Sequence, residues 1–172
     1  MDELRAALTA FAAQQIVRCR HLGLDLAPYP IGHVAYRTDD LDEYVRMRDE
    51  IAHHCVANVE NEWSGRPISK LLLREPLRVS DHHSIPLIEL IPPPHRPDYA
   101  LGVEHVGFAL GDDVDPVGEQ FVEIVTEQQD QGPFNQPYLI TFDDRTGVKL
   151  HRWPLAEVVR KEGREFTGFG LT

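Results

Sequence analysis

The sequence has no long apolar run, almost no cysteine and too few basic residues to balance the acidic ones. Its apolar stretches fall short of the ~20 residues that span a bilayer. The start, Met1–Arg5, is acidic where a signal peptide is basic. Cys19 and Cys55 lack Cys-x-x-Cys spacing, which excludes a disulfide framework and a zinc knuckle. We therefore expect a protein of the reducing cytoplasm.

Positive charge is also scarce. The sequence contains 17 Lys and Arg residues and 28 Asp and Glu residues, which gives a net charge of −11. So acidic a surface repels phosphate backbones and anionic lipid, so we expect no nucleic-acid and no membrane partner. The length of 172 residues fits one domain over 29–172, preceded by a helical extension over 1–28.

The first 22 residues show helical periodicity. Apolar side chains recur there at spacings of three and four: Leu4, Leu8, Phe11, Ala12, Ile16 and Cys19. This pattern predicts an amphipathic helix over 2–22. We expect it to pack on the outside of a sheet or on a partner subunit.

After the helix, a strand and helix pattern occurs twice. The first copy is predicted to have strands over 31–38, 56–63, 68–74 and 85–91, with a helix over 41–54. Three prolines at 92–94 end this copy. The second has strands over 103–110, 137–143 and 148–153 and a closing helix over 155–162. Residues 121–127 fit either helix or strand, and their β-branched run favours a strand.

This order predicts an α+β fold. Two βαβββ-type modules, about 31–91 and 102–153 with the second reduced, would form a curved mixed sheet around a central cleft.

Four strand-like runs each carry one residue of a type that binds metals: His33, Glu89, His105 and His151. Imidazoles with a carboxylate suit a divalent ion such as Fe, Mn, Zn or Ni. Glu89 lies in the apolar run Pro-Leu-Ile-Glu-Leu-Ile, where a buried carboxylate is costly without a partner. The alternatives are hydrogen-bonded or surface histidines and an edge strand on which Glu89 faces water.

Several short motifs, in this order and spacing, resemble the YecM family of the vicinal-oxygen-chelate superfamily, which includes glyoxalase, extradiol dioxygenases and bleomycin-resistance proteins. The matching segments are His33–Arg37, Ser64–Pro67, Glu75–Pro76, Ile88–Leu90, Val103–His105, Val148–Trp153 and Leu155–Val159.

The resemblance implies a divalent metal held by His33, Glu89 and His105. The superfamily usually carries a further Glu ligand on its eighth strand. Here the equivalent position, after Gly147, is His151, which is either a fourth ligand or a catalytic general base. A shortened segment at 111–120 would leave the cleft more open or filled by the partner of a homodimer.

Three further residues are candidate substrate contacts. Arg37 shares a strand face with His33, about 13 Å along, and resembles an arginine that holds a carboxylate in 2-oxo-acid dioxygenases of the superfamily. Its alternative is a salt bridge. Arg66 is a second candidate, or a solvated turn residue. Tyr138 would line the pocket, or belong to the aromatic core.

Two functions follow from this reading. One is a metal-dependent oxidoreductase, isomerase or lyase that acts on a small oxo- or hydroxy-acid through two of its oxygens. The other is a non-catalytic protein that binds a small molecule or metal on the same fold. A purely structural interaction module would leave Glu89 unexplained.

Overall fold

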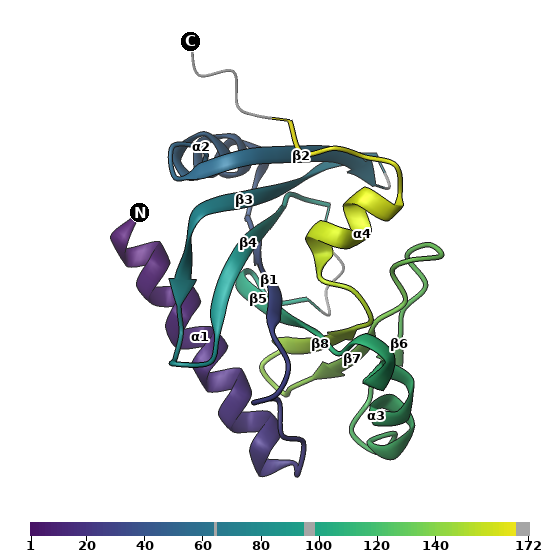
Figure 1. Cartoon of the computed structure of the whole chain (residues 1–172). Helices are drawn as coiled ribbons and strands as arrows, with labels where there is room; N and C mark the ends of the chain where they lie inside the picture. Colours follow the sequence, from purple (N-terminus) through teal and green to yellow (C-terminus); the bar gives the residue numbers. More distant parts are fainter. Residues whose placement is uncertain (64, 95–98, 168–172) are drawn as a thin grey trace.

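A computed structural model describes residues 1–63, 65–94 and 99–167 of the chain. They form one mixed eight-stranded sheet with strand order β2-β3-β4-β1-β5-β8-β7-β6 (Figure 1). The first module contains β1 (Ile31–Arg37), α2 (Leu41–Ala52), β2 (Cys55–Trp63), β3 (Arg66–Arg78) and β4 (Ser84–Ile91). The second contains β5 (Gly102–Ala109), α3 (Val114–Gln120), β6 (Glu127–Gln128), β7 (Tyr138–Thr141) and β8 (Gly147–His151).

The two modules repeat one topology. In the first, β1 pairs in parallel with β4, and in the second β5 pairs in parallel with β8. The modules join where β1 and β5 pair antiparallel at the centre of the sheet. The predicted α+β fold with two βαβββ modules is therefore confirmed.

The two faces of the central strands differ in chemistry. One face is apolar, and its fully buried side chains, including Val34, Ile88, Val106 and Val148, belong to the main hydrophobic core. The opposite face carries His33, Ala35 and Arg37 on β1, as strand alternation requires. His33 and Arg37 of β1 thus lie on the face of the sheet opposite the main core.

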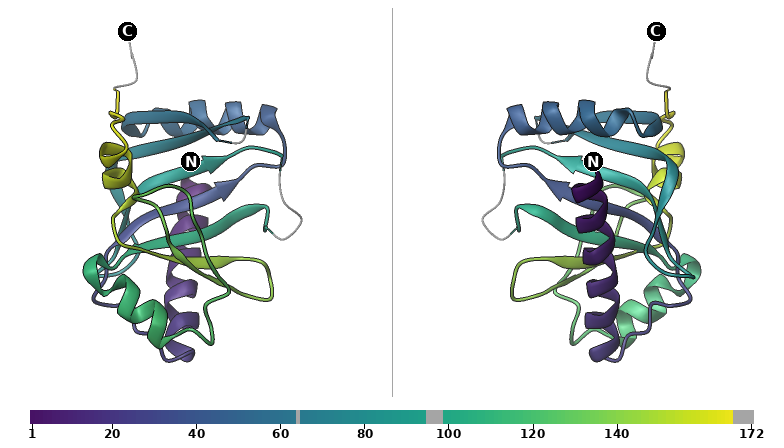
Figure 2. Two further views of the ribbon diagram at one scale, coloured as in Figure 1. Left: turned by 90° about the vertical axis from the view of Figure 1, so that its right-hand side faces the viewer. Right: turned by 90° about the vertical axis from the view of Figure 1, so that its left-hand side faces the viewer.

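Helices cover the two faces unequally. The N-terminal helix α1 (Asp2–His21) buries Leu8, Ala12 and Ile16 in the main core, as its periodicity predicts. It therefore packs on the outside of the sheet. The C-terminal helix α4 (Leu155–Lys161) packs Leu155 and Val158 against Leu87 on the other face. Figures 1 and 2 show α1 and α4 on opposite sides of the central strands.

The strand predicted over 121–127 is wrong. The chain forms a 3-10 turn over Gly111–Asp113 and then α3, and residues 121–124 are a turn. Phe121, Ile124 and Val125 pack against the main core from that turn, so tertiary contacts override the strand preference of this β-branched stretch. Only Glu127 and Gln128 pair with β7.

The other expectations on the fold need smaller changes. β3 is longer than the 68–74 expected and begins at Arg66. Ser64 of the expected turn and residues 95–98 after the proline run lie outside the described residues. Within the described part of the chain, no helix is both long and apolar enough for a membrane crossing.

Candidate metal centre

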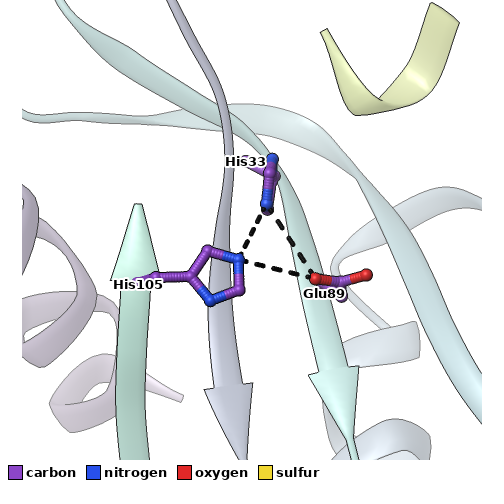
Figure 3. Close-up of side chains that lie close together, drawn as sticks. All are labelled: His33, Glu89 and His105. Atoms are coloured by element: carbon purple, nitrogen blue, oxygen red, sulfur yellow. Dashed lines mark hydrogen bonds and ion pairs between the residues drawn. The ribbon is translucent and has the colours of Figure 1, made fainter. Parts of the chain in front are cut away.

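The structure brings together three of the four predicted ligands. His33, Glu89 and His105 come from β1, β4 and β5, and one ligand atom from each lies within 4.8 Å of the others (Figure 3). The two imidazole Nε2 atoms are 3.2 Å apart. The Oε2 of Glu89 is 3.9 Å from Nε2 of His33 and 3.7 Å from Nε2 of His105. The three side chains therefore converge on one point.

These separations match the needs of a metal ion. Two ligands about 2.1 Å from one ion lie about 3.0 Å apart at a right angle and about 3.4 Å apart at the tetrahedral angle. The observed 3.2 Å falls in this range, and 3.7 and 3.9 Å exceed it by a few tenths of an ångström. The donor set, two imidazoles and a carboxylate, also fits a divalent ion.

Close contact between the modules sets the position of His33. Gly107 of β5 lies directly opposite His33 in the β1–β5 pairing. A Cβ atom at position 107 would lie 2.1 Å from Cε1 of His33. The imidazole therefore occupies the space that any side chain at 107 would fill.

A buried carboxylate that the sequence reading missed orients His105. Nδ1 of His105 lies 3.0 Å from Oε1 of Glu104. Since a carboxylate only accepts hydrogen bonds, Nδ1 carries the proton and Nε2 presents its lone pair to His33 and Glu89. Arg37 donates from Nε to the other oxygen of Glu104. Arg37, Glu104 and His105 thus form one continuous chain of contacts.

A β-bulge explains why Glu104 reaches this face. Strict alternation would put it on the face opposite His105. In the β1–β5 register, however, Ala35 pairs with His105 and Tyr36 with Val103, so Glu104 is an extra residue without a partner in the ladder. Such a bulge re-aims a side chain. A bulge has no clear mark in a single sequence, so only the structure identifies Glu104.

Burial sets the protonation of the cluster. It lowers the pKa of His33 well below the usual value, and the neighbouring His105 lowers it further. Burial likewise lowers the pKa of His105, with Lys149 adding to the effect. For Glu104, burial alone would raise the pKa, but hydrogen bonds from His105 and Arg37 hold it well below its usual value. The cluster therefore holds neutral imidazoles beside an ionised carboxylate, the state that binds metals.

A pocket of about 730 Å³ opens beside this cluster. Glu89 lies in its wall, whereas His33 and His105 are buried beneath it. The pocket is lined by side chains from both modules and by α4, and its charged residues are Arg37, Arg66, Lys70, Glu89, Glu127, Asp130, Lys149, Glu162 and Arg164. A ligand in this pocket would reach the cluster from the Glu89 side.

The other predicted site residues lie at different places. Arg37 lines the pocket, but it is 4% exposed, pairs with Glu104 and lies 4.5 Å from the centre of the Tyr99 ring. Arg66 also lines the pocket and donates to the backbone oxygens of Pro92 and Pro94.

Tyr138 is not among the residues that line the pocket. Its ring packs on Gly118 of α3, and its hydroxyl donates to Asp115 over 3.4 Å.

His151 is buried next to the cluster rather than within it. Its ring centre is 5.2 Å from that of His33, and its Nε2 has no hydrogen-bond partner among the described residues. It is outside the group of three whose ligand atoms converge. Burial, and then His33, lower its pKa well below the usual value. Its roles as a fourth ligand or a base remain predictions.

Two βαβββ modules that share a sheet, with a His-Glu-His cluster at their junction, form the topology that the vicinal-oxygen-chelate resemblance implies. The family model described as YecM protein matches residues 1–135, and the chain belongs to this family. Protein YecM of Escherichia coli (strain K12) is 25% identical over 158 residues, which cover 83% of this chain and 84% of that protein.

Two solved structures are also similar. One is named Structural Genomics, Protein EC4020, is 25% identical, and has a TM-score of 0.72 over 94% of this chain and 92% of its own. It shares the fold described above. The other is the fosfomycin resistance protein FosX of Listeria monocytogenes, complexed with Mn(II) and sulfate ion. It is 13% identical over 76% of this chain and 94% of its own, and its TM-score of 0.30 supports no argument about this chain.

The contact between Gly107 and His33 predicts a specific coupling. In Gly107→Ala the new methyl group collides with the imidazole, and overpacking of this kind costs about 1–3 kcal/mol of unfolding free energy. In a His33→Ala background the space is free, so the same substitution should cost less than about half as much. Urea denaturation of the wild type, both single variants and the double variant measures this. Equal costs in the two backgrounds would contradict the contact.

Proposed function

We propose that this protein is a metal-dependent enzyme that acts on a small acid able to present two oxygens to one ion. The observation that supports it is the convergence of His33, Glu89 and His105 beside a pocket large enough for a small molecule. The way in which these side chains are buried supports ligation. Two neutral imidazoles face each other at 3.2 Å, and Nδ1 of His33 has no hydrogen-bond partner among the described residues.

The residues of the cluster have separate tasks in this proposal. His33 and His105 hold the ion from beneath, and Glu104 fixes the ring of His105 with its lone pair toward the ion. Glu89 closes the site on the pocket side, where its side chain is 14% exposed. A substrate in the pocket would reach the ion from this side, with its oxygens next to the carboxylate of Glu89.

The bound ion supplies Lewis-acid chemistry, which polarises an oxygen of the substrate. With three protein ligands, positions remain for substrate and water, as in catalytic rather than structural sites. Fe, Mn, Zn and Ni all suit this donor set, and the reaction would be that of an oxidoreductase, an isomerase or a lyase.

Metal binding should depend on the converging side chains. Untagged protein, loaded and then desalted, should hold about one equivalent of Mn(II) or Zn(II), as a site of two or more imidazoles and a carboxylate does. His33→Ala and Glu89→Gln should each lower the affinity by about 100-fold, because each removes one of three ligands. The exposed His53→Ala should bind like the wild type. Elemental analysis and competition with a chromophoric chelator measure these affinities.

Two outcomes would count against the proposal. Metal content below about 0.1 equivalent would mean that the cluster is not a metal site. Full metal content without turnover would favour the non-catalytic binding protein. Turnover is assayed by NMR of 2-oxo and 2-hydroxy acids with the loaded protein. An oxygen electrode in the same reactions separates an oxygenase from an isomerase or a lyase.

Glu104 should act on metal affinity through His105. Glu104→Gln keeps the size of the side chain but removes the charge that orients the imidazole, and such changes cost about 10–100-fold in affinity. Glu62→Gln, an exposed carboxylate on β2, should have no effect. The urea midpoint of each variant shows whether the fold is intact. An affinity of Glu104→Gln within about twofold of the wild type would remove Glu104 from this role.

A further inference from the structure

Lys149 occupies the position in the second module that Glu89 occupies in the first. In the β1–β4 pairing, Glu89 lies opposite Ala35, two residues after His33. In the β5–β8 pairing, Lys149 lies opposite Gly107, two residues after His105. The repeat therefore aligns His33 with His105 and Glu89 with Lys149. By the same register, His151 lies opposite Ala109 and aligns with Ile91, which lies opposite Arg37.

This alignment changes which residue stands at the expected fourth ligand position. The sequence reading gave that position to His151, because it is the next metal-binding residue type after Gly147. The strand register gives it to Lys149 instead. An ammonium group does not bind a metal ion, so this position has a different chemistry from its counterpart.

The ammonium of Lys149 forms no hydrogen bond or ion pair with the part of the chain that the structure describes. Its side chain is 7% exposed and lines the pocket, yet it makes no hydrogen bond or salt bridge with any described residue. The two other buried cations of the pocket, Lys70 and Arg37, do have partners. Lys70 contacts Asn61 and lies 4.0 Å from Glu89, and Arg37 pairs with Glu104. Glu89 and Glu104 attract the buried ammonium electrostatically, but neither forms a hydrogen bond or an ion pair with it, so Lys149 is suited to bind an anionic ligand.

The buried charges at the base of the pocket add up to an excess of one positive charge. Three cations, Arg37, Lys70 and Lys149, stand against two carboxylates, Glu89 and Glu104. The remaining charged residues of the pocket are partly or fully exposed, where water and salt screen them. This excess of positive charge, to which a bound metal ion would add, favours an anionic ligand such as a carboxylate.

We propose that Lys149 binds the carboxylate of the substrate beside the His33, Glu89 and His105 cluster. The contact of the substrate with a metal ion in the cluster rests on the proposed function. The binding of an anion by Lys149 does not need the metal. The substrate is then a short organic acid whose carboxylate and adjacent oxygen span from Lys149 to the cluster. Arg37 is a positioning residue for Glu104 instead of the carboxylate anchor.

The test compares an acid with its neutral analogue. L-lactate and lactamide have nearly the same shape but differ by one negative charge. NMR titration of the full untagged chain, with Zn(II) and separately with EDTA, measures both affinities. We expect lactate to bind at least about 10-fold more tightly than lactamide, as an added buried ion pair implies. Lys149→Met should bring lactate down to the lactamide level, and Lys149→Arg should restore most of the difference.

Two measurements keep the result interpretable. Lys161→Met removes an exposed lysine outside the pocket and should bind lactate like the wild type. Lys149→Met should also raise the urea midpoint, because an apolar side chain of similar length replaces a buried ammonium that forms no hydrogen bond with the described residues. A lower midpoint with lactate binding unchanged would overturn the inference.

The inference and the proposed function fail separately. A preference for lactate that persists in EDTA and vanishes in Lys149→Met supports the anion site, even if no metal binds. Equal binding of lactate and lactamide by the metal-loaded wild type overturns the anion site, whereas the metal titration with His33→Ala still decides the metal centre.

Discussion

The antiparallel pairing of β1 with β5 is the contact on which the rest of the structure depends. It joins two modules that each have an open sheet edge. Its register determines which residue of one module lies opposite which residue of the other. His33 fits against Gly107 only in this register, and Ala35 gives room opposite His105. The bulge in the same pairing turns the side chain of Glu104 to the face that carries His33 and His105. A slip by one residue would turn these side chains to the apolar face and dismantle both core and cluster.

Much of the fold could be predicted from the sequence because its signals are local. Periodicity of two marks the strands, periodicity of 3.6 marks α1, and the repeated order of elements indicates two modules. The same local patterns identified His33, Glu89 and His105, since each interrupts an apolar strand with a polar group that is costly to bury. The turn at 121–124 could not be predicted, because its apolar side chains respond to the core around them and not to their neighbours in sequence.

The remaining site residues depend on strand register, which a single sequence does not show. Glu104 is misplaced by any reading that assumes strict alternation, since it lies in a bulge. Lys149 and His151 lie two residues apart on β8, and only the pairing with β5 shows which of them corresponds to Glu89. The salt-bridge partner of Arg37 depends on the same register, because strict alternation would put Glu104 on the other face.

The close match between the modules also bears on how a ligand can orient itself. A site with the same groups in both halves would accept an elongated molecule equally well in two directions, related by the pseudo-twofold axis. Glu89 and Lys149 break that equivalence, because they put opposite charges at matching positions. A molecule with one charged end would then bind in a single direction. An internal repeat has in this way produced a polar site from symmetric parts, in which the two ends of a substrate can be distinguished.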